Sequence, residues 1–252
     1  LQSTLICVWG HCLLQILAGG TVACFCYGHT GAGKTHTVLG YNGELGLLGL
    51  AASALCVDLQ GQAALHLGLR VAEVHNGRVV DLLAGDHCTR REMFVREDQL
   101  GQMHIRGAAA RLADGRVEVR PLSTEYASTA AEAASIVSKA VALRAIGGSG
   151  LNSQSSRSHA LLEVELVTAE VIRWREASIR AESLLVPASK DVEAALADVL
   201  HPPAGADWQL WFDALQDTKT AAQHELDASV AGLAAAVAAG PVGVGGTLVF
   251  VD

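Results

Sequence analysis

Residues 21–37 read TVACFCYGHTGAGKTHT, an apolar run that leads directly into a glycine-rich loop. The run is rich in β-branched and aromatic residues and ends at a glycine, which is typical of a buried strand. The loop from Gly28 to Thr35 matches the pattern G-x-x-x-x-G-K-[ST] at every fixed position. Because a strand enters the pattern, as phosphate binding by such a loop requires, a chance glycine-rich turn is the weaker explanation.

The residue types in this loop explain how it can bind phosphate. Glycine allows the backbone to curl so that several N–H groups point into one concavity, which suits phosphate oxygens. A helix that starts at the end of the loop adds partial positive charge. Lys34 can reach the β- and γ-phosphates, and the hydroxyl group of Thr35 can ligate Mg²⁺. The sequence therefore predicts a site for a nucleotide and Mg²⁺.

Predicted helices and strands alternate along the chain on either side of this loop. Apolar spacing and capping residues predict helices over residues 3–18, 47–59 and 129–146, the last opened by the capping-box pattern of Thr129 and Glu132. Strands are predicted over residues 65–75, 160–167 and 246–252, with shorter pieces between 93 and 119 and a short helix or strand end at 79–83. The alternation predicts an α/β fold with a largely parallel or mixed sheet flanked by helices.

Composition narrows the class of protein. The chain has 252 residues and a formal net charge of −8, which provides no basic footprint for nucleic acid. Two stretches free of charge, residues 5–28 and 229–251, are interrupted by glycine or proline, so we expect no membrane span. The chain begins with Leu1, without a basic segment before its first apolar stretch, and is expected to be a piece of a longer protein.

Six cysteines raise the question of disulfides or a metal site. No C-x-x-C pair occurs, and Cys24 and Cys26 lie within the apolar run before the loop. Two neighbouring thiols without further ligands make a poor zinc site. We expect the cysteines to be reduced and to pack as small apolar residues.

Four segments resemble the kinesin motor family. The run FCYGHTGAGKTHTVLG (25–40) resembles F-A-Y-G-Q-T-G-S-G-K-T-x-T-M-x-G, and NSQSSRSH (152–159) matches the switch I pattern N-x-x-S-S-R-S-H throughout. AEVHNGRVVDLL (72–83) and VREDQLGQMHIRGAA (95–109) are similar to two further family motifs, in diverged form. The order and spacing are similar to those of kinesins from residue 4 to about residue 167. Details of these motifs look most like the chromokinesin (Kid-type) subgroup.

The resemblance implies a role for each matching position, with ATP and Mg²⁺ as cofactors. The cofactor-binding residues would be Gly28, His29, Thr30, Gly31, Ala32, Gly33, Lys34 and Thr35 at the phosphates and magnesium, and His36 near the adenine. The catalytic switch I residues would be Asn152, Ser155, Ser156 and Arg157, which close on the γ-phosphate. The magnesium would be held by Thr35, Ser156 and, through a water molecule, Asp252.

A prediction about the sheet follows from these roles. We expect strand 21–27 to lie centrally, with strands 160–167 and 246–252 near it, because the three Mg²⁺ residues lie at strand ends or in loops of one face. Thr35, Ser156 and Asp252 would then converge around one Mg²⁺-sized space.

The chain departs from the family pattern in three places. The opening strand with its R-x-R-P element is absent, and so is the L-A-G-S-E segment that follows the position of Asp252 in the family. The connection between the strands at 160–167 and 246–252 is about 80 residues long, well beyond an ordinary loop. We expect a motor core over 1–168, an alanine-rich insertion over 169–245 interrupted by Pro187 and Pro202-Pro203, and a last core strand over 246–252. The insertion has its own helices or is poorly ordered, and a translated non-coding stretch is a competing explanation.

The function implied by the resemblance is an ATPase that couples hydrolysis to movement along microtubules. It would act in the cytoplasm on the microtubule cytoskeleton, or in the spindle or nucleus if the chromokinesin likeness holds, without direct binding to nucleic acid or membrane. Taken alone, this chain is expected to be weak or inactive as an ATPase. The alternatives are a degenerate kinesin-like scaffold without turnover and a P-loop NTPase of another family. The sequence carries no signal for an oligomeric state.

Overall fold

The computed structural model describes residues 2–29, 31–41, 44–58, 65–84, 91–97, 101, 103–146 and 158–251. The chain divides into two compact units. We call Leu1–Gly107, Pro121–Ala169 and Gly240–Asp252 the sheet unit, and Ala108–Arg120 and Glu170–Ala239 the hairpin unit. The division of the chain into residues 1–168, 169–245 and 246–252 stays a prediction.

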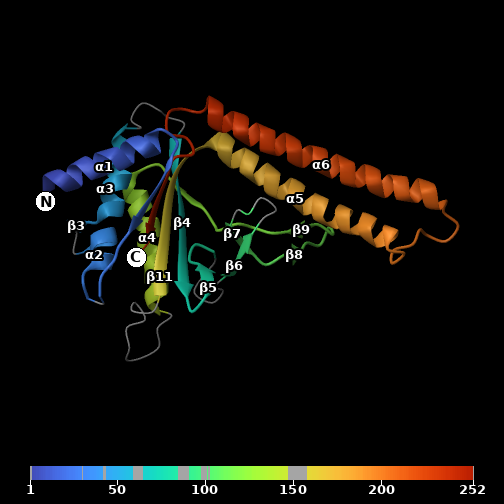
Figure 1. Ribbon diagram of the computed structural model, residues 1–252, viewed down its shortest axis with the longest axis horizontal. Helices are drawn as coiled ribbons and strands as arrows, with labels where there is room; N and C mark the ends of the chain where they lie inside the picture. Colours follow the sequence, from blue (N-terminus) through green and yellow to red (C-terminus); the bar gives the residue numbers. More distant parts are fainter. Residues whose placement is uncertain are drawn as a thin grey trace. The chain divides into compact units, whose positions relative to one another are not determined.

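The sheet unit is built on one mixed β-sheet (Figure 1). Its described strands follow the order β1-β12-β11-β4-β5-β6-β7, and β10 pairs with β4 beside this path. Among them, β1 and β12 are parallel and the other pairs are antiparallel. The bounds are β1 Thr21–Phe25, β4 Leu65–His75, β5 Arg78–Asp81, β6 Arg91–Glu97, β7 Met103–Gly107, β10 Glu125–Ala127, β11 Ser158–Thr168 and β12 Thr247–Val251. The predicted mixed α/β architecture is confirmed.

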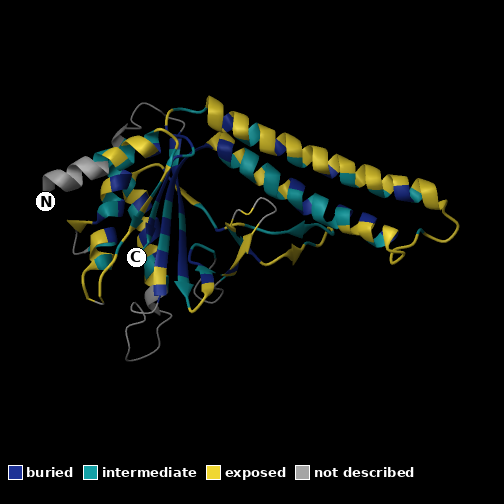
Figure 2. Ribbon diagram, in the orientation of Figure 1, coloured by how far each residue is buried: buried dark blue, intermediate teal, exposed yellow. Residues whose placement is uncertain are grey.

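The strands β4 and β11 form the longest ladder of this sheet. They pair antiparallel from Ser158 opposite His75 to Thr168 opposite Leu65. Both were predicted from sequence, and their residues are mostly buried (Figure 2). The hairpin from β4 to β5 turns at Asn76 and Gly77, which have φ angles of 50° and 76°. Two residues with positive φ form the type of turn that matches the twist of paired strands, so residues 79–81 continue as a strand.

Four helices supply apolar side chains to the larger of the two buried clusters that the described residues of the sheet unit form. They are α1 Gln2–Leu17, α2 Lys34–Leu39, α3 Leu47–Asp58 and α4 Ala130–Ile146, and a two-stranded ribbon of β2 Gly40–Tyr41 and β3 Glu44–Leu45 follows α2. Ile16, Val38, Leu55 and Val137 from these helices join the buried cluster around Phe250 of β12. A smaller cluster, formed by Ala72, Val79, Met93 and Leu122, occupies the other face of β4, since successive strand residues point to opposite faces. No helix among the described residues has the length and hydropathy of a membrane span.

The prediction that β1 is a central, buried strand is wrong. Among the described strands, β1 is an edge strand of the sheet, and it pairs only with β12. Cys24 and Cys26 pack against the larger core, but the side chain of Phe25 is 72% exposed and Tyr27 is fully exposed. The described helices of this unit cover β1 from one side, so its apolar residues alternate between half-buried and exposed positions.

The capping box predicted at the start of α4 is confirmed. The hydroxyl group of Thr129 accepts a hydrogen bond from the backbone N–H of Glu132 at 3.2 Å, and the carboxylate of Glu132 accepts one from the N–H of Ser128 at 2.7 Å. The bond to Thr129 satisfies a backbone donor of the first turn of α4, and the bond to Glu132 holds the N–H of the residue before the cap.

We expect Thr129→Ala to lower the free energy of unfolding by about 1 kcal/mol, because the substitution removes the cap of α4. Ser138→Ala is the matched control, since Ser138 is an exposed residue within the same helix. Alanine is the better helix former there, so the control should raise the stability by about 0.4 kcal/mol. Urea denaturation followed by circular dichroism measures both values, and equal effects of the two substitutions would contradict the assigned cap.

The hairpin unit contains two long helices, α5 Ala169–Leu196 and α6 Trp208–Ala239, and a small ribbon of β8 Ala110–Arg111 and β9 Val117–Glu118 (Figure 1). Each helix carries a continuous series of buried or half-buried residues at alternating spacings of three and four. This is the heptad spacing of coiled coils, and we call the two series together the seam. The seam residues are Val171, Trp174, Ser178, Ala181, Leu185, Ala188, Val192 and Ala195 in α5, and Phe212, Leu215, Lys219, Ala222, Leu226, Ser229, Leu233 and Ala236 in α6.

Contacts along the seam show how the two helices are aligned. The hydroxyl groups of Ser178 and Ser229 are 3.0 Å apart. Near the end of α6, the indole ring of Trp174 occupies the space beside Gly232, where an added Cβ would lie 2.6 Å from the ring. At the other end, Phe212 packs with Val192 and Ala195. Contacts at both ends and in between define one antiparallel register of α5 and α6.

The prediction that Pro187 interrupts the insertion is wrong, whereas Pro202 and Pro203 do lie between the helices. α5 continues through Pro187 as one helix of 28 residues. A proline within a helix removes one hydrogen bond and costs about 3 kcal/mol. Seam residues lie on both sides of it, with Ala188 buried and Leu185 half-buried, so packing against α6 offsets that cost.

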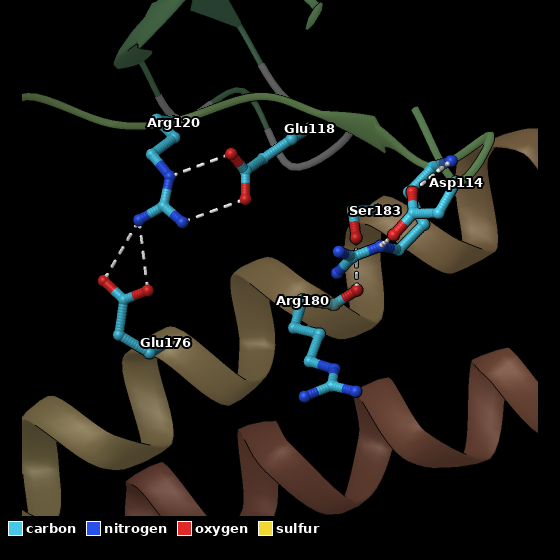
Figure 3. Close-up of polar contacts among 7 residues, drawn as sticks. Asp114, Glu118, Arg120, Glu176, Arg180 and Ser183 are labelled. Carbon is cyan, nitrogen blue, oxygen red and sulfur yellow. Dashed lines mark hydrogen bonds and ion pairs between the residues drawn. The ribbon is translucent and has the colours of Figure 1, made fainter. Parts of the chain in front are cut away.

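The segment that follows the small ribbon is attached to α5 by charged groups (Figure 3). The guanidinium group of Arg120 donates two hydrogen bonds of 2.9 Å to the carboxylate of Glu118. It donates two more to Glu176 of α5, at 3.1 and 3.3 Å. Hydrogen bonds to Glu118, and then the charge of Glu176, raise the pKa of Arg120 although partial burial opposes them. Arg120 thus links the segment after β9 to the helix.

Candidate nucleotide-binding site

The glycine-rich loop begins where β1 leaves the sheet. The last ladder pair of β1 and β12 joins Phe25 to Val251, and the N–H of Cys26 donates to the carbonyl of Val251 at 2.9 Å. The loop then runs to Lys34, the first residue of α2. This arrangement of strand, loop and helix is the context that the sequence predicted for phosphate binding.

Backbone angles show why glycine is needed in the loop. Gly31 and Gly33 both have a φ angle of 84°, in the left-handed region that other residues rarely adopt. Among the described residues, chain neighbours aside, none has an atom within 4 Å of where their Cβ atoms would be, so the loop presents open space beside its backbone. A Cβ at Gly28 would approach the Cβ of Ala32 to 3.0 Å. The loop therefore has the curled, accessible backbone that a phosphate group requires.

Lys34 lies across this loop. Its ammonium group donates hydrogen bonds to the carbonyl oxygens of Gly28, at 2.9 Å, and His29, at 3.1 Å. The loop is closed further by a bond from the N–H of Ala32 to the carbonyl of His29. A positive charge held against the open loop is the arrangement expected where an anionic group binds, so the residues present fit a nucleotide phosphate.

The predicted site residues that follow Lys34 are exposed to solvent. Thr35 and His36 are exposed, and the imidazole of His36 lies 4.0 Å from the carboxylate of Glu44. Both members of that pair are largely exposed, so the interaction contributes little. Thr30 lies outside the described residues.

One supporting residue of the loop was missed in the sequence. The N–H and the hydroxyl group of Thr37 both donate to the carbonyl of Gly33, at 2.8 and 3.0 Å. These bonds anchor the turn between the loop and α2. The signal was a threonine at the third position after the lysine, where a hydroxyl group can reach back four residues.

The switch I residues Asn152, Ser155, Ser156 and Arg157, and also Asp252, lie outside the described residues. Their chain neighbours are described. Ser158 is buried and starts β11, and β11 runs antiparallel to β12 with Leu161 opposite Val251. The first residues of β11 and the last residues of β1 and β12 therefore lie side by side, at the same ends of the strands of the sheet. The convergence of Thr35, Ser156 and Asp252 at these strand ends stays a prediction.

The structure describes the side chains of four cysteines of the sheet unit, and two of them, Cys24 and Cys26, lie at the end of β1 before the loop. Cys12, Cys24, Cys26 and Cys56 are half-buried and form no disulfide among the described residues. Burial, and then the neighbouring thiols Cys26 and Cys12, raise the pKa of Cys24. A raised pKa keeps this thiol protonated at neutral pH, where a protonated thiol is a poor nucleophile.

Comparison with known proteins identifies relatives of this chain. The family model described as the kinesin motor domain matches residues 7–186. Kinesin-like protein KIF24 of Homo sapiens is 34% identical over 160 residues, which are 62% of this chain and 10% of that protein. The mouse (Mus musculus) protein of the same name is 32% identical over 160 residues, with the same coverage. Kinesin-like protein KIN-5A of Arabidopsis thaliana is 29% identical over 188 residues, 68% of this chain and 17% of that protein.

The chain thus spans less than a fifth of the length of these relatives. A solved structure described as "Structure of a fast kinesin: Implications for ATPase mechanism and interactions with microtubules" is 22% identical, with a TM-score of 0.45, over 62% of this chain and 42% of that chain. The likeness to the chromokinesin subgroup stays a prediction. Since the family model matches well over half of the 252 residues, and the predicted phosphate-binding loop forms between a strand and a helix, this chain belongs to the kinesin motor domain family.

Proposed function

We propose that this chain binds Mg·ATP at the loop of residues 28–36, and that the protein to which it belongs couples ATP hydrolysis to movement along microtubules. The observation that supports the first part is the position of Lys34, whose ammonium group lies against the open glycine loop. Membership of the kinesin family supports the second part. Such a protein would act in the cytoplasm on the microtubule cytoskeleton.

The described residues have separate tasks in this proposal. The backbone N–H groups around Gly31 and Gly33 donate to phosphate oxygens, since the curled loop leaves space beside them. Lys34 exchanges its bonds to the carbonyls of Gly28 and His29 for bonds to phosphate oxygens. The hydroxyl group of Thr35 would hold Mg²⁺, which when bound would neutralise charge on the phosphates. His36, exposed at the start of α2, contacts the base.

The remaining catalytic residues are assigned through the family resemblance. Asn152, Ser155, Ser156 and Arg157 would form switch I at the γ-phosphate, and Asp252 would help to hold the magnesium. The support from the structure is indirect. Ser158 and Val251, which neighbour these residues in the chain, lie at the edge of the sheet where the loop begins.

A nucleotide titration tests this proposal. We expect a fluorescent ATP analogue to bind this chain, and Mg²⁺ to tighten the binding by at least about tenfold, a factor that corresponds to about 1.4 kcal/mol. The control is the same titration in the presence of a chelator. Binding that does not respond to Mg²⁺ would contradict the role of Thr35. Phosphate release with and without polymerised tubulin then separates a motor from a scaffold that binds nucleotide without turnover.

A further inference from the structure

The end of the helical hairpin exposes a group of large apolar side chains. They lie in the last turn of α5, in the connection at 197–207 and in the first turn of α6. We call these three segments together the hairpin end. The exposed fractions are 67% for Leu196, 75% for Val199, 36% for Leu200, 45% for Trp208 and 73% for Leu210. These five residues lie beyond the ends of the seam, and they stay exposed although the ring of Trp208 stacks on the seam residue Phe212. Large apolar side chains that are exposed together at one end of an element are candidates for a contact surface.

Hydrogen bonds and packing hold the hairpin end in a defined shape. The N–H groups of Val199 and Leu200 both donate to the carbonyl of Ala194, at 2.8 and 3.1 Å. The carboxylate of Asp207 caps α6 by accepting a bond of 2.9 Å from the N–H of Leu210. The ring of Trp208 stacks on Phe212, with centroids 4.9 Å apart. A surface that is already ordered loses little entropy when a partner binds.

The charges around these apolar residues have one sign. Between residues 190 and 213 the chain carries five carboxylates and one ammonium group, a formal charge of −4 with histidine neutral. The carboxylates, all on exposed residues, belong to Asp191, Glu193, Asp198, Asp207 and Asp213. The ammonium group is that of Lys190, which is also exposed. The hairpin end is therefore an apolar surface with an acidic border.

We propose that the hairpin end is a docking surface for a basic amphipathic helix of a partner protein. The apolar face of such a helix would cover the most exposed of these residues, Val199 and Leu210, and its lysine or arginine side chains would meet the surrounding carboxylates. A second copy of this chain is a poorer occupant, because two acidic ends repel each other at close range. An anionic lipid surface is disfavoured for the same reason. The proposal does not depend on nucleotide binding.

The test uses a defined probe, an 18-residue helical peptide of leucine and lysine with leucine at positions i, i+3, i+4 and i+7. Titration calorimetry should detect binding of this peptide to the chain, and raising the salt from 0.05 M to 0.3 M should weaken it by about tenfold. A peptide with glutamate in place of lysine should not bind. The double variant Val199→Ser/Leu210→Ser should weaken binding of the lysine peptide at least about tenfold, and Asp198→Asn/Asp213→Asn about fivefold.

A matched control variant replaces one exposed apolar side chain and one carboxylate in another part of α6. Val230, which is 53% exposed, and the exposed Asp227 lie far along the helix from the hairpin end, so Val230→Ser/Asp227→Asn should leave the affinity unchanged. Circular dichroism of each variant verifies that the helices remain. Three results would overturn the proposal: equal loss of binding in the control, self-association that Val199→Ser/Leu210→Ser abolishes, or preferred binding to phosphatidylserine vesicles. The first result would indicate nonspecific binding of the peptide. The second would indicate that a second copy of this chain binds the hairpin end, and the third that a membrane surface does.

Discussion

Replacement of Lys34 by alanine is expected to weaken Mg·ATP binding by at least about 100-fold. Lys34 supplies a positive side chain within the loop, and its ammonium group already lies against the loop at 2.9 and 3.1 Å from two carbonyl oxygens. A hydrogen bond to a charged group contributes about 1.5–3 kcal/mol. Loss of two such bonds to phosphate oxygens therefore amounts to about 3 kcal/mol, or two factors of ten in affinity. Titration with a fluorescent ATP analogue measures the change.

Two further variants show whether the effect belongs to this ammonium group. Lys139→Ala removes an exposed lysine from α4 and should leave the affinity unchanged. Lys34→Arg keeps the charge but replaces a compact ammonium by a planar fork, so partial binding is expected. Unchanged affinity in Lys34→Ala, with the loop still folded, would show that the phosphate does not bind at this loop.

Replacement of Arg70 by alanine is expected to destabilise the protein by about 3–5 kcal/mol, the range found when one member of a buried ion pair is removed. Arg70 on β4 faces Glu163 on β11, and its guanidinium group lies 2.5 Å from Glu163 and 2.6 Å from Glu165. The side chains of Arg70 and Glu165 are only 16% and 5% exposed. Burial alone would lower the pKa of Arg70, but the two carboxylates raise it, so the group stays charged.

Alanine at position 70 would leave two carboxylates on one face of β11 without their cation. Urea denaturation followed by circular dichroism measures the loss of stability. Arg78→Ala is the control, because Arg78 is 78% exposed and 3.7 Å from Glu92, and an exposed pair contributes about 0–1 kcal/mol. The neutral triple variant Arg70→Met/Glu163→Gln/Glu165→Gln should recover part of the stability that Arg70→Ala loses. A loss in Arg70→Ala no greater than that in Arg78→Ala would refute the assigned role of this ion cluster.

Much of the secondary structure follows from local chemistry and could be predicted from sequence. The alternation of apolar residues marked β4 and β11, and glycines marked the end of α1 and the start of the loop. The capping box at Thr129 located the start of α4 to within one residue. The hairpin at Asn76-Gly77 was also present as a signal, because this dipeptide favours the turn that joins paired strands. The apolar run at 79–83 alone is compatible with a short helix or a strand end, and the turn before it selects the strand.

The motifs of the candidate site could also be found in the sequence, because their signal is local. A phosphate-binding loop needs particular residues within a few positions of one another, so Gly31, Gly33 and Lys34 carry the signal without reference to the rest of the fold. The order of the motifs along the chain then indicated the family. Switch I and Asp252 remain predictions, since the described residues include only their neighbours Ser158 and Val251.

Tertiary contacts decided what the local patterns could not. The composition of β1 indicated burial, but its exposure depends on which elements lie beside it, and Phe25 is 72% exposed. Pro187 is a helix breaker by local propensity, but packing of α5 along the seam maintains the helix around it. The seam itself was hidden in an alanine-rich sequence, because small residues on every side of a helix give little contrast between faces. Only the pairing of α5 with α6 separates the alanines that are buried from those that face solvent.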